Sequence, residues 1–457
     1  MFSKSYNTEL KTYYNNVDDF NRYPNDIMAE YKQSVEEGFD IEMHKELFES
    51  VSKMENGEKK VQMSDLIFET VMGAELKKDY KYNEPNELSK IKELRKEHKF
   101  LQQMPNEATL KAKLVGAWTG RACGCLLGKP LEGIRSDELI PLLKETGNYP
   151  LHRYLLKTDI KDDMHSRYKF YLKNKAYADT VDGMPVDDDT NYVVLGQKII
   201  EEYGRDFDTT SVGKAWLKYQ SVYSYFTAER VAFINLINCL EPPATAIYKN
   251  VCREWIGAQI RGDYFGYINP GAPEAAAEMA FKDARLSHVK NGIYGEMLVS
   301  AMLSCAAVTE NIEDIIFGGL AQIPATSRLY EAVIKIYDLY KSGASSEEVF
   351  EYIHSQYDEH TDHGWCHTIS NAMIVIAALL YGEGDFGRSI CIAVGMAFDT
   401  DCNGATVGSI LGMRGGIACI NEYWKKPVNN KIHTSIFGVG TVDIEKAAEK
   451  TLEQIKQ

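Results

Sequence analysis

Hydrophobic and polar residues follow a helical pattern over most of the chain, most clearly downstream of Ala108. There, apolar residues recur three and four positions apart, which is the spacing of one face of an α-helix. Alternating patterns typical of strands are few. The pattern predicts an all-α fold, with expected helices at Leu110–Leu127, Asn191–Tyr203, Thr209–Val222, Pro273–Ala284, Tyr294–Thr309, Ile312–Leu320, Ser327–Ser342, Ser346–Gln356, Thr368–Leu380, Phe386–Ala397 and Ala405–Met413.

The first 105 residues differ from the rest, because they are highly charged and almost free of glycine. No residue there suggests catalysis, so an accessory helical layer or an oligomerisation element is the simplest interpretation. We expect two parts: an N-terminal helical extension, residues 1–105, and a compact multi-helix bundle, residues 106–457, in which residues 131–185 form an irregular insertion or a partly structured loop. Helical periodicity in the extension is found at Asn25–Ser34, Ile41–Met54 and Met63–Leu76.

Glycine recurs every four residues in two of the expected helices. Inside a helix each glycine costs about 1 kcal/mol relative to alanine, but this spacing forms a stripe along which a second backbone can approach closely. Such stripes also join membrane helices, but Arg121, Lys129 and Arg414 argue against that interpretation. We hypothesise that both helices lie at the centre of the bundle. Their glycines are Gly116, Gly120, Gly124 and Gly128 in one, and Gly404, Gly408, Gly412 and Gly416 in the other.

Composition and charge narrow the class of protein. The chain has 457 residues, 44% of them hydrophobic, and a formal net charge of -15. These values are ordinary for a globular protein, and the acidity argues against nonspecific binding to nucleic acid or to an anionic membrane. The expected partners therefore include neither. A nucleotide-like ligand remains compatible with local cations or backbone amides.

The cysteines and the apolar runs indicate a cytoplasmic protein. An odd number of cysteines, nine, with no C-x-x-C pair argues against a disulfide framework and a zinc ribbon. Residues Met1–Tyr6 lack the apolar segment of a signal peptide. The most apolar run, Ala372–Leu380, is too short to cross a bilayer.

Acidic residues alternate with other residues in the stretch Asp399-Thr-Asp-Cys-Asn-Gly404. The spelling resembles the start of an EF-hand, which also requires an acidic residue at the twelfth position. Counting from Asp399, that position is Ile410, so the stretch is not an EF-hand.

A second acidic run, Asp187–Asp189, also lies directly before an expected helix. Asp and Thr at such positions cap helix N-termini, which is the simplest explanation for either run alone. One capping residue would suffice, however, and adjacent carboxylates repel one another. Two such runs favour a shared cation site, and oxygen ligands suit Mg²⁺, Mn²⁺ or Ca²⁺ rather than zinc.

A histidine cluster offers a different metal hypothesis. His363 and His367 are four residues apart and would share a helix face, as in a zinc site. The alternative is that this segment only leads into a core helix.

Four motifs, taken together and in order, resemble the ADP-ribosylglycohydrolases. The likeness extends from about Leu110 to about Gly416, and it implies a compact all-α catalytic domain that binds two divalent ions, usually Mg²⁺, between two acidic loops. The motifs are Gly116-Ala-Trp-Thr-Gly-Arg-Ala-Cys-Gly-Cys-Leu-Leu-Gly-Lys-Pro-Leu-Glu132-Gly, Asp187-Asp-Asp-Thr190, Gly266-Tyr-Ile-Asn-Pro-Gly271 with Leu286-Ser-His288, and Asp399-Thr-Asp-Cys-Asn-Gly-Ala-Thr-Val-Gly408.

The resemblance implies roles for individual residues. Glu132 matches the family's mobile glutamate and is the expected acid/base, with Asp188 and Asp189 as further catalytic residues. The expected metal ligands are Asp187, Asp188, Asp189, Asp399, Asp401 and Cys402, and the residues expected to bind the substrate are Phe265, Gly266, Tyr267, Asn269, Gly271 and His288.

Three positions depart from the family's pattern. Asp187 stands where a hydroxyl residue is common, and Arg121 stands where many relatives carry an acidic residue. Cys402 stands where a threonine ligand is expected. Because a thiol is a poor ligand for Mg²⁺, the ion beside it is expected to be weaker, water-completed or replaced by a softer metal such as Mn²⁺.

The activity implied by the resemblance is metal-dependent hydrolysis of the glycosidic bond between ADP-ribose and an acceptor. The partner is then an ADP-ribosylated protein or a small-molecule conjugate of ADP-ribose. Two alternatives stay open: hydrolysis of another N-ribosyl compound, and a non-catalytic relative that only binds ADP-ribose.

Overall fold

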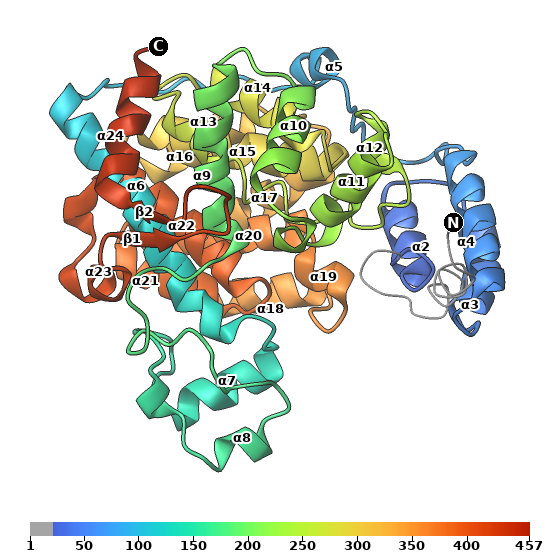
Figure 1. Cartoon of the computed structure of the whole chain (residues 1–457), viewed down its shortest axis with the longest axis horizontal. Helices are drawn as coiled ribbons and strands as arrows, with labels where there is room; N and C mark the ends of the chain where they lie inside the picture. Colours follow the sequence, from blue (N-terminus) through green and yellow to red (C-terminus); the bar gives the residue numbers. More distant parts are fainter. Residues whose placement is uncertain (1–21) are drawn as a thin grey trace, which may run out of the picture.

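The computed structural model describes residues 22–457, and within them it confirms the all-α fold. The prediction about Met1–Tyr6 lies outside the described residues. In the described part of the chain the only sheet is a small antiparallel one, in which β1 (Lys431–His433) pairs with β2 (Thr441–Asp443). Figure 1 shows this sheet at the edge of a large helical body.

Two helices lie at the centre, α6 (Glu107–Gly128) and α22 (Thr400–Gly415). They run antiparallel with their glycine rows facing each other, Gly120 against Gly408 and Gly124 against Gly404. A Cβ atom added to any of these four glycines would overlap the carbonyl oxygen of its partner. The hypothesis that both helices lie at the centre of the bundle is therefore confirmed.

The surrounding helices bury this pair on most sides. α15 is mostly apolar and is buried from Asn291 to its end, as expected for a core helix. In chain order the helices after α6 are α7 (Ser136–Glu145), α8 (Met164–Arg167), α9 (Asp188–Tyr203), α10 (Thr209–Tyr219), α11 (Thr227–Ile237), α12 (Ala244–Ile247), α13 (Asp263–Tyr267), α14 (Pro273–Ala284), α15 (Lys290–Ala306), α16 (Ile312–Leu320), α17 (Arg328–Lys341), α18 (Ser346–Gln356), α19 (Asp362–Cys366), α20 (Thr368–Tyr381), α21 (Phe386–Gly395), α22, α23 (Glu422–Val428) and α24 (Ile444–Ile455).

The predicted helices differ from the observed ones at several ends, including α15, which begins four residues earlier than expected, and both helices that follow the acidic runs. α9 begins three residues earlier than expected and α22 five residues earlier, so both acidic runs lie in or next to the first helical turn. The expected irregular insertion, residues 131–185, contains α7 and α8. Seven further helices of the described residues were not predicted: α5 (Leu88–Glu93), α11, α12, α13, α19, α23 and α24.

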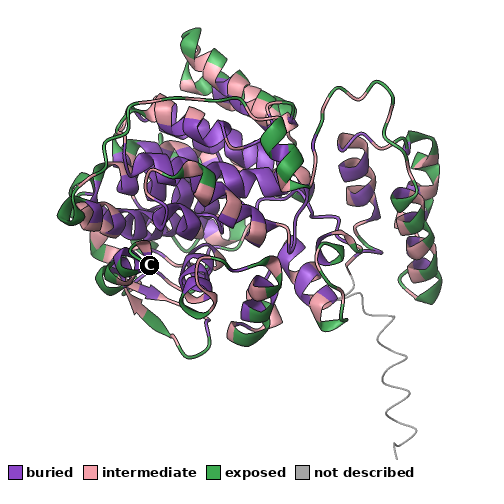
Figure 2. Ribbon diagram, turned by 90° about the horizontal axis from the view of Figure 1, so that it is seen from above, coloured by how far each residue is buried: buried purple, intermediate pink, exposed green. Residues whose placement is uncertain are grey.

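The N-terminal extension packs as a small helical layer on one side of the body (Figure 1). Its own core includes Ile27 and Phe48, and it continues into Trp255 and Cys366 of the body. Figure 2 shows the buried residues concentrated in the central helices, whereas this layer carries more exposed ones. The boundary at residue 105 stays a prediction. The helices of the layer are α2 (Ile27–Glu36), α3 (Lys45–Ser52) and α4 (Glu58–Met72), and α5 (Leu88–Glu93) follows them.

All nine cysteines are free. Within residues 22–457, no helix has both the length and the apolar character needed to cross a membrane.

Candidate active site

The two acidic runs lie at the N-termini of α9 and α22. Asp187 caps α9, because its Oδ1 accepts a hydrogen bond from the backbone N–H of Asp189 at 2.9 Å. Asp399 occupies the corresponding position before α22 without such a bond. The positive ends of two helix dipoles therefore face the carboxylates. Helix capping accounts for Asp187 but not for the other aspartates of the two runs.

The carboxylates form two groups of potential metal ligands. In the first, ligand atoms of Cys125, Asp187, Asp189 and Asp401 lie within 4.8 Å of one another. In the second, Asp399, Asp401 and Cys402 do the same. Asp401 belongs to both groups, which is the position of a ligand shared by two neighbouring cations. The half-buried Asp188 lies beside these groups rather than in either.

Two cationic side chains, one in α6 and one directly after it, hold the upstream acidic run. Arg121 is buried; its guanidinium donates a hydrogen bond to Asp189 Oδ1 at 3.2 Å and forms an ion pair with Asp263 Oδ2 at 2.9 Å. The Lys129 ammonium contacts Asp187 Oδ2 and lies 3.9 Å from Asp401 Oδ2. Arg121 therefore pairs with a carboxylate of the acidic run, which gives a role to a residue that departs from the family's pattern.

Sequence reasoning missed Cys125 and Lys129. A signal was present, since Arg121, Cys125 and Lys129 are four residues apart and each follows a glycine of the α6 stripe. The glycines face α22, and the residues after them face the start of α9. The same four-residue spacing thus marks a second stripe, Arg121, Cys125 and Lys129, beside the glycine stripe.

The electrostatics of the site favour a bound cation. Burial first, and repulsion between carboxylates second, raises the pKa of Asp188, Asp189 and Asp399. The buried Oδ2 of Asp189 also has no hydrogen-bond partner among the described residues. Arg121 and Lys129 offset only part of the negative charge. A divalent ion would satisfy the unpaired oxygen and relieve the repulsion, so the donor set fits a metal.

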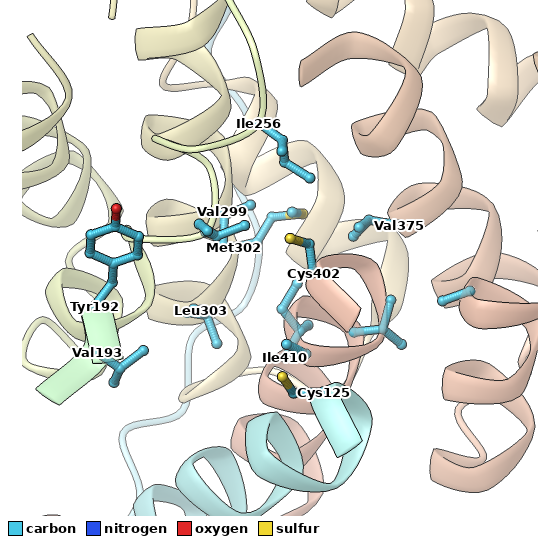
Figure 3. Close-up of a cluster of buried hydrophobic side chains, with 14 of the residues drawn as sticks. Cys125, Tyr192, Val193, Ile256, Val299, Met302, Leu303, Val375, Cys402 and Ile410 are labelled. Carbon is cyan, nitrogen blue, oxygen red and sulfur yellow. The ribbon is translucent and has the colours of Figure 1, made fainter. Parts of the chain in front are cut away.

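Each ligand group includes one cysteine. Figure 3 shows Cys125 and Cys402 among buried apolar side chains, with Ile256 and Met302 near Cys402. Burial raises the pKa of both thiols well above its usual range, so both are neutral without a metal. The Cys402 thiol then donates a hydrogen bond to Asp399. Neutral sulfur is a weak ligand for hard Mg²⁺.

Glu132 lies at the rim of this cluster, directly after the short 3₁₀ turn Lys129–Leu131. Its side chain is 42% exposed, which leaves it open to a substrate. The negative charge of Asp401, followed by burial, raises the pKa of Glu132 well above its usual value. Asp401 and Glu132 share a hydrogen bond. A carboxyl group that holds its proton beside an acidic cluster is suited to act as a general acid.

The predicted nucleotide-binding residues Phe265, Tyr267 and Asn269 lie in the core. The ring of Phe265 stacks on Phe207 with centroids 5.3 Å apart, and the hydroxyl of Tyr267 shares a 2.6 Å hydrogen bond with Ser409 of α22. The amide of Asn269 bonds the Phe265 carbonyl at 2.8 Å. These contacts describe packing beneath the site, and contact with a substrate stays a prediction.

The remaining residues of that prediction are also enclosed. A Cβ atom at Gly266 would lie 2.6 Å from the carbonyl oxygen of Ser300 on α15, so glycine there permits close helix packing. Gly271 has a φ of +69°, which favours glycine. His288 is buried with Nδ1 2.8 Å from Ser287 Oγ, and burial lowers its pKa well below the usual value. Their contact with a substrate stays a prediction.

A cavity of about 850 Å³ lies apart from the acidic cluster, between α7, α18 and α21. None of the predicted site residues lines it. Its volume suits a small molecule, but it does not contribute to the site described above.

Fold and site together define an all-α protein with a buried acidic cluster at the N-termini of two helices, and this cluster could hold metal ions. The model of the ADP-ribosylglycohydrolase family matches residues 106–457. The chain belongs to the ADP-ribosylglycohydrolase family, and this membership supports glycosyl hydrolase activity on ADP-ribose conjugates.

Two further comparisons complete the picture. A solved structure described as "ADP-ribosylglycohydrolase-related protein complex" is similar over 76% of this chain and 99% of its own, with 15% sequence identity and a TM-score of 0.43. No curated protein matches the chain. The family assignment therefore rests on the family model.

Proposed function

We propose that the protein uses divalent ions to hydrolyse the glycosidic bond between ADP-ribose and an acceptor, either a protein side chain or a small molecule. The observation that carries the proposal is the pair of ligand groups that share Asp401. Two ions, Mg²⁺ or Mn²⁺, would be held by Asp187, Asp189 and Asp401 on one side, and by Asp399, Asp401 and Cys402 on the other. Whether the bond is N- or O-glycosidic depends on the acceptor.

Individual residues of the site would then have separate roles in the reaction. Bound divalent ions orient ribose hydroxyls and water and lower the pKa of that water. Glu132, which is partly exposed at the rim of the site, would protonate the leaving atom of the acceptor and afterwards accept a proton from water. Asp188 lies beside the ligand groups and would orient the attacking water. Arg121 would hold the Asp189 carboxylate in place through its hydrogen bond to Oδ1.

A release assay tests this function. The protein would be mixed with arginine- and serine-ADP-ribosylated peptides in Mg²⁺ or Mn²⁺, and free ADP-ribose would be measured. Release that stops with EDTA and returns with added metal supports the proposal. Cleavage of free nucleosides without release of ADP-ribose would instead identify an N-ribosyl hydrolase, and tight ADP-ribose binding without turnover would identify a non-catalytic relative.

Replacing Cys402 by threonine is expected to tighten Mg²⁺ binding by about tenfold, the scale of effects found when groups around a metal are altered. A hydroxyl oxygen is a better ligand for Mg²⁺ than a neutral buried thiol. Isothermal titration calorimetry would measure the change in dissociation constant. Cys391→Thr is the matched control, since Cys391 is a buried thiol outside both ligand groups. Equal Mg²⁺ affinity in Cys402→Thr and the wild type would exclude Cys402 as a ligand.

We also propose a cytoplasmic location. The support is that all nine cysteines are free, five of them in the core of the body near or within the central helices. Free thiols in this number are typical of a reducing compartment. Fractionation of cells that express the protein would test the location.

A further inference from the structure

The end of α2 contacts two buried histidines of the body. Oε2 of Glu36 lies 2.9 Å from Nε2 of His363 and 3.8 Å from Nε2 of His367. Glu36 belongs to the N-terminal extension, outside the part that matches the family, whereas the histidines lie in α19 and directly before α20. Figure 1 shows α2 on the side of the body where α19 lies.

The hydrogen bonds of the two histidines fix their tautomers. Nδ1 of His363 accepts the indole N–H of Trp255 at 3.2 Å, and Nδ1 of His367 accepts the backbone N–H of Ile369 at 3.1 Å. In a neutral imidazole the other nitrogen then carries the proton. Each Nε2 therefore carries a proton and has no lone pair for zinc. The Nε2–H of His363 donates to Glu36, whereas Nε2 of His367, 3.8 Å from the same oxygen, has no hydrogen-bond partner among the described residues. The three side chains lie within reach of a single ion, but these proton positions disfavour the zinc hypothesis.

From His367 the contacts lead to the second acidic run. Asn371, one turn further along α20, donates from Nδ2 to the carbonyl oxygens of Trp365 at 2.9 Å and of His367 at 3.0 Å. Its Oδ1 accepts the backbone N–H of Asp399 at 3.2 Å and the side-chain amide of Asn403 at 2.8 Å. Asn371 is fully buried. The backbone that carries Asp399 is thus held by a residue whose own orientation depends on the His367 segment.

The same segment also holds the loop after Glu132. The guanidinium of Arg135 lies 4.7 Å from the ring centroid of Trp365. Just before α19, the carboxylate of Glu359 accepts the backbone N–H of Ser136 at 3.0 Å. Both ends of the site, the Asp399 loop and the Glu132 loop, therefore rest on residues 359–371.

We propose that the N-terminal extension is a positioning part of the active site, and that Glu36 is the positioning residue through which it acts. Glu36 accepts the Nε2–H of His363 and places its negative charge beside His367. It thereby fixes the turn between α19 and α20, and so holds Asn371 and the ligands Asp399 and Asp401 in place. The inference rests on the proposed function, because it assigns Asp399 and Asp401 to a metal. It gives residues 22–105 a role beyond packing.

The test compares two neighbouring isosteric substitutions, Glu36→Gln and Glu37→Gln, in the full chain. Glu37 also anchors α2, through Arg253 at 2.6 Å and Lys290 at 2.8 Å, but it does not touch the histidines. Glutamine at 36 can keep a carbonyl oxygen as acceptor for the His363 N–H, but it removes the negative charge that faces both imidazoles. Both variants should lower the melting temperature, whereas only Glu36→Gln should raise the Mn²⁺ dissociation constant, by about tenfold. Electron paramagnetic resonance of bound Mn²⁺ reports the affinity independently of activity.

A double variant sharpens the result. If Glu36 acts through Asn371, Glu36→Gln combined with Asn371→Ala should raise the Mn²⁺ dissociation constant no more than Asn371→Ala alone. Equal effects of Glu36→Gln and Glu37→Gln, or additive effects in the double variant, would overturn the inference while leaving the proposed function intact. A wild-type protein that binds no Mn²⁺ would overturn the metal component of the proposed function as well.

Discussion

Gly120→Ala is expected to destabilise the protein by more than about 4 kcal/mol, a magnitude reserved for severe core disruption. The added Cβ would overlap the carbonyl oxygen of Gly408. The atoms that collide belong to the backbones of two central helices, so no side chain can turn away to make room. Gly408→Ala should behave alike, because its Cβ would overlap the carbonyl oxygen of Gly120.

Soluble yield and chemical unfolding measure this effect. Since whole domains are stable by only about 5–15 kcal/mol, leucine at either position should abolish soluble expression. Gly395→Ala is the matched control, because Gly395 is helical but the nearest atom to its added Cβ, Leu151 Cβ, is 3.8 Å away. That variant should be stabilised by up to about 1 kcal/mol. Wild-type stability of Gly120→Ala would contradict the close packing of α6 and α22.

Asp401→Asn is expected to lower kcat/KM by about a thousandfold, since the loss of metal-based stabilisation costs several kcal/mol. Asp401 contributes to both ligand groups, so its loss affects both ions. The same change should stabilise the metal-free protein, because burial and the nearby Asp187 raise the pKa of Asp401 and a neutral amide removes that repulsion. Activity and stability are therefore expected to move in opposite directions.

The control for this prediction is Asp182→Asn. The side chain of Asp182 is 72% exposed and pairs with Lys431 at the surface, so both kcat/KM and the melting temperature should stay near the wild-type values. Kinetics would be measured with an ADP-ribosylated peptide at saturating Mn²⁺, and melting in EDTA. A fully active Asp401→Asn protein would rule out the shared ligand position.

Helices with clear local signals were predicted well. Pro273–Ala284 begins with proline at its first position, and Ser346–Gln356 follows a capping box formed by Ser345 and Glu348, so the observed bounds agree with the expected ones. α11 follows Phe226, whose side chain makes no cap, and its apolar residues are spread around the helix. Without a cap or an apolar face, its sequence carried no signal that distinguishes it from a loop.

Near the acidic runs, by contrast, local sequence preferences gave the wrong start for a helix. Asp, Thr and Asn favour caps and turns in isolation, so the sequence placed the start of α22 after Gly404. In the structure, tertiary packing against α6 overrides that preference: Thr400 Oγ1 donates to the carbonyl oxygen of Gly128 at 3.0 Å, and the helix begins there. The sequence motifs pointed to the right carboxylates, but it took the structure to add Cys125 and Lys129.

The substrate-binding prediction illustrates what a motif alone cannot decide. An aromatic pair such as Phe265 and Tyr267 has the same sequence pattern whether it faces a ligand or the core. Here Phe207 covers one ring and Trp118 lies 5.8 Å from the other. Both neighbours are distant in sequence, so only the tertiary structure shows the environment of the pair.

The glycine pairs along α6 and α22 leave these helices a single register. Sliding either helix by one residue would bring a side chain against a backbone at every contact, from Gly116 with Gly412 to Gly128 with Thr400. The start of α22 and the end of α6 are therefore held in a fixed position relative to each other. The carboxylates at the start of α22 are thereby fixed in position relative to Lys129, directly after α6.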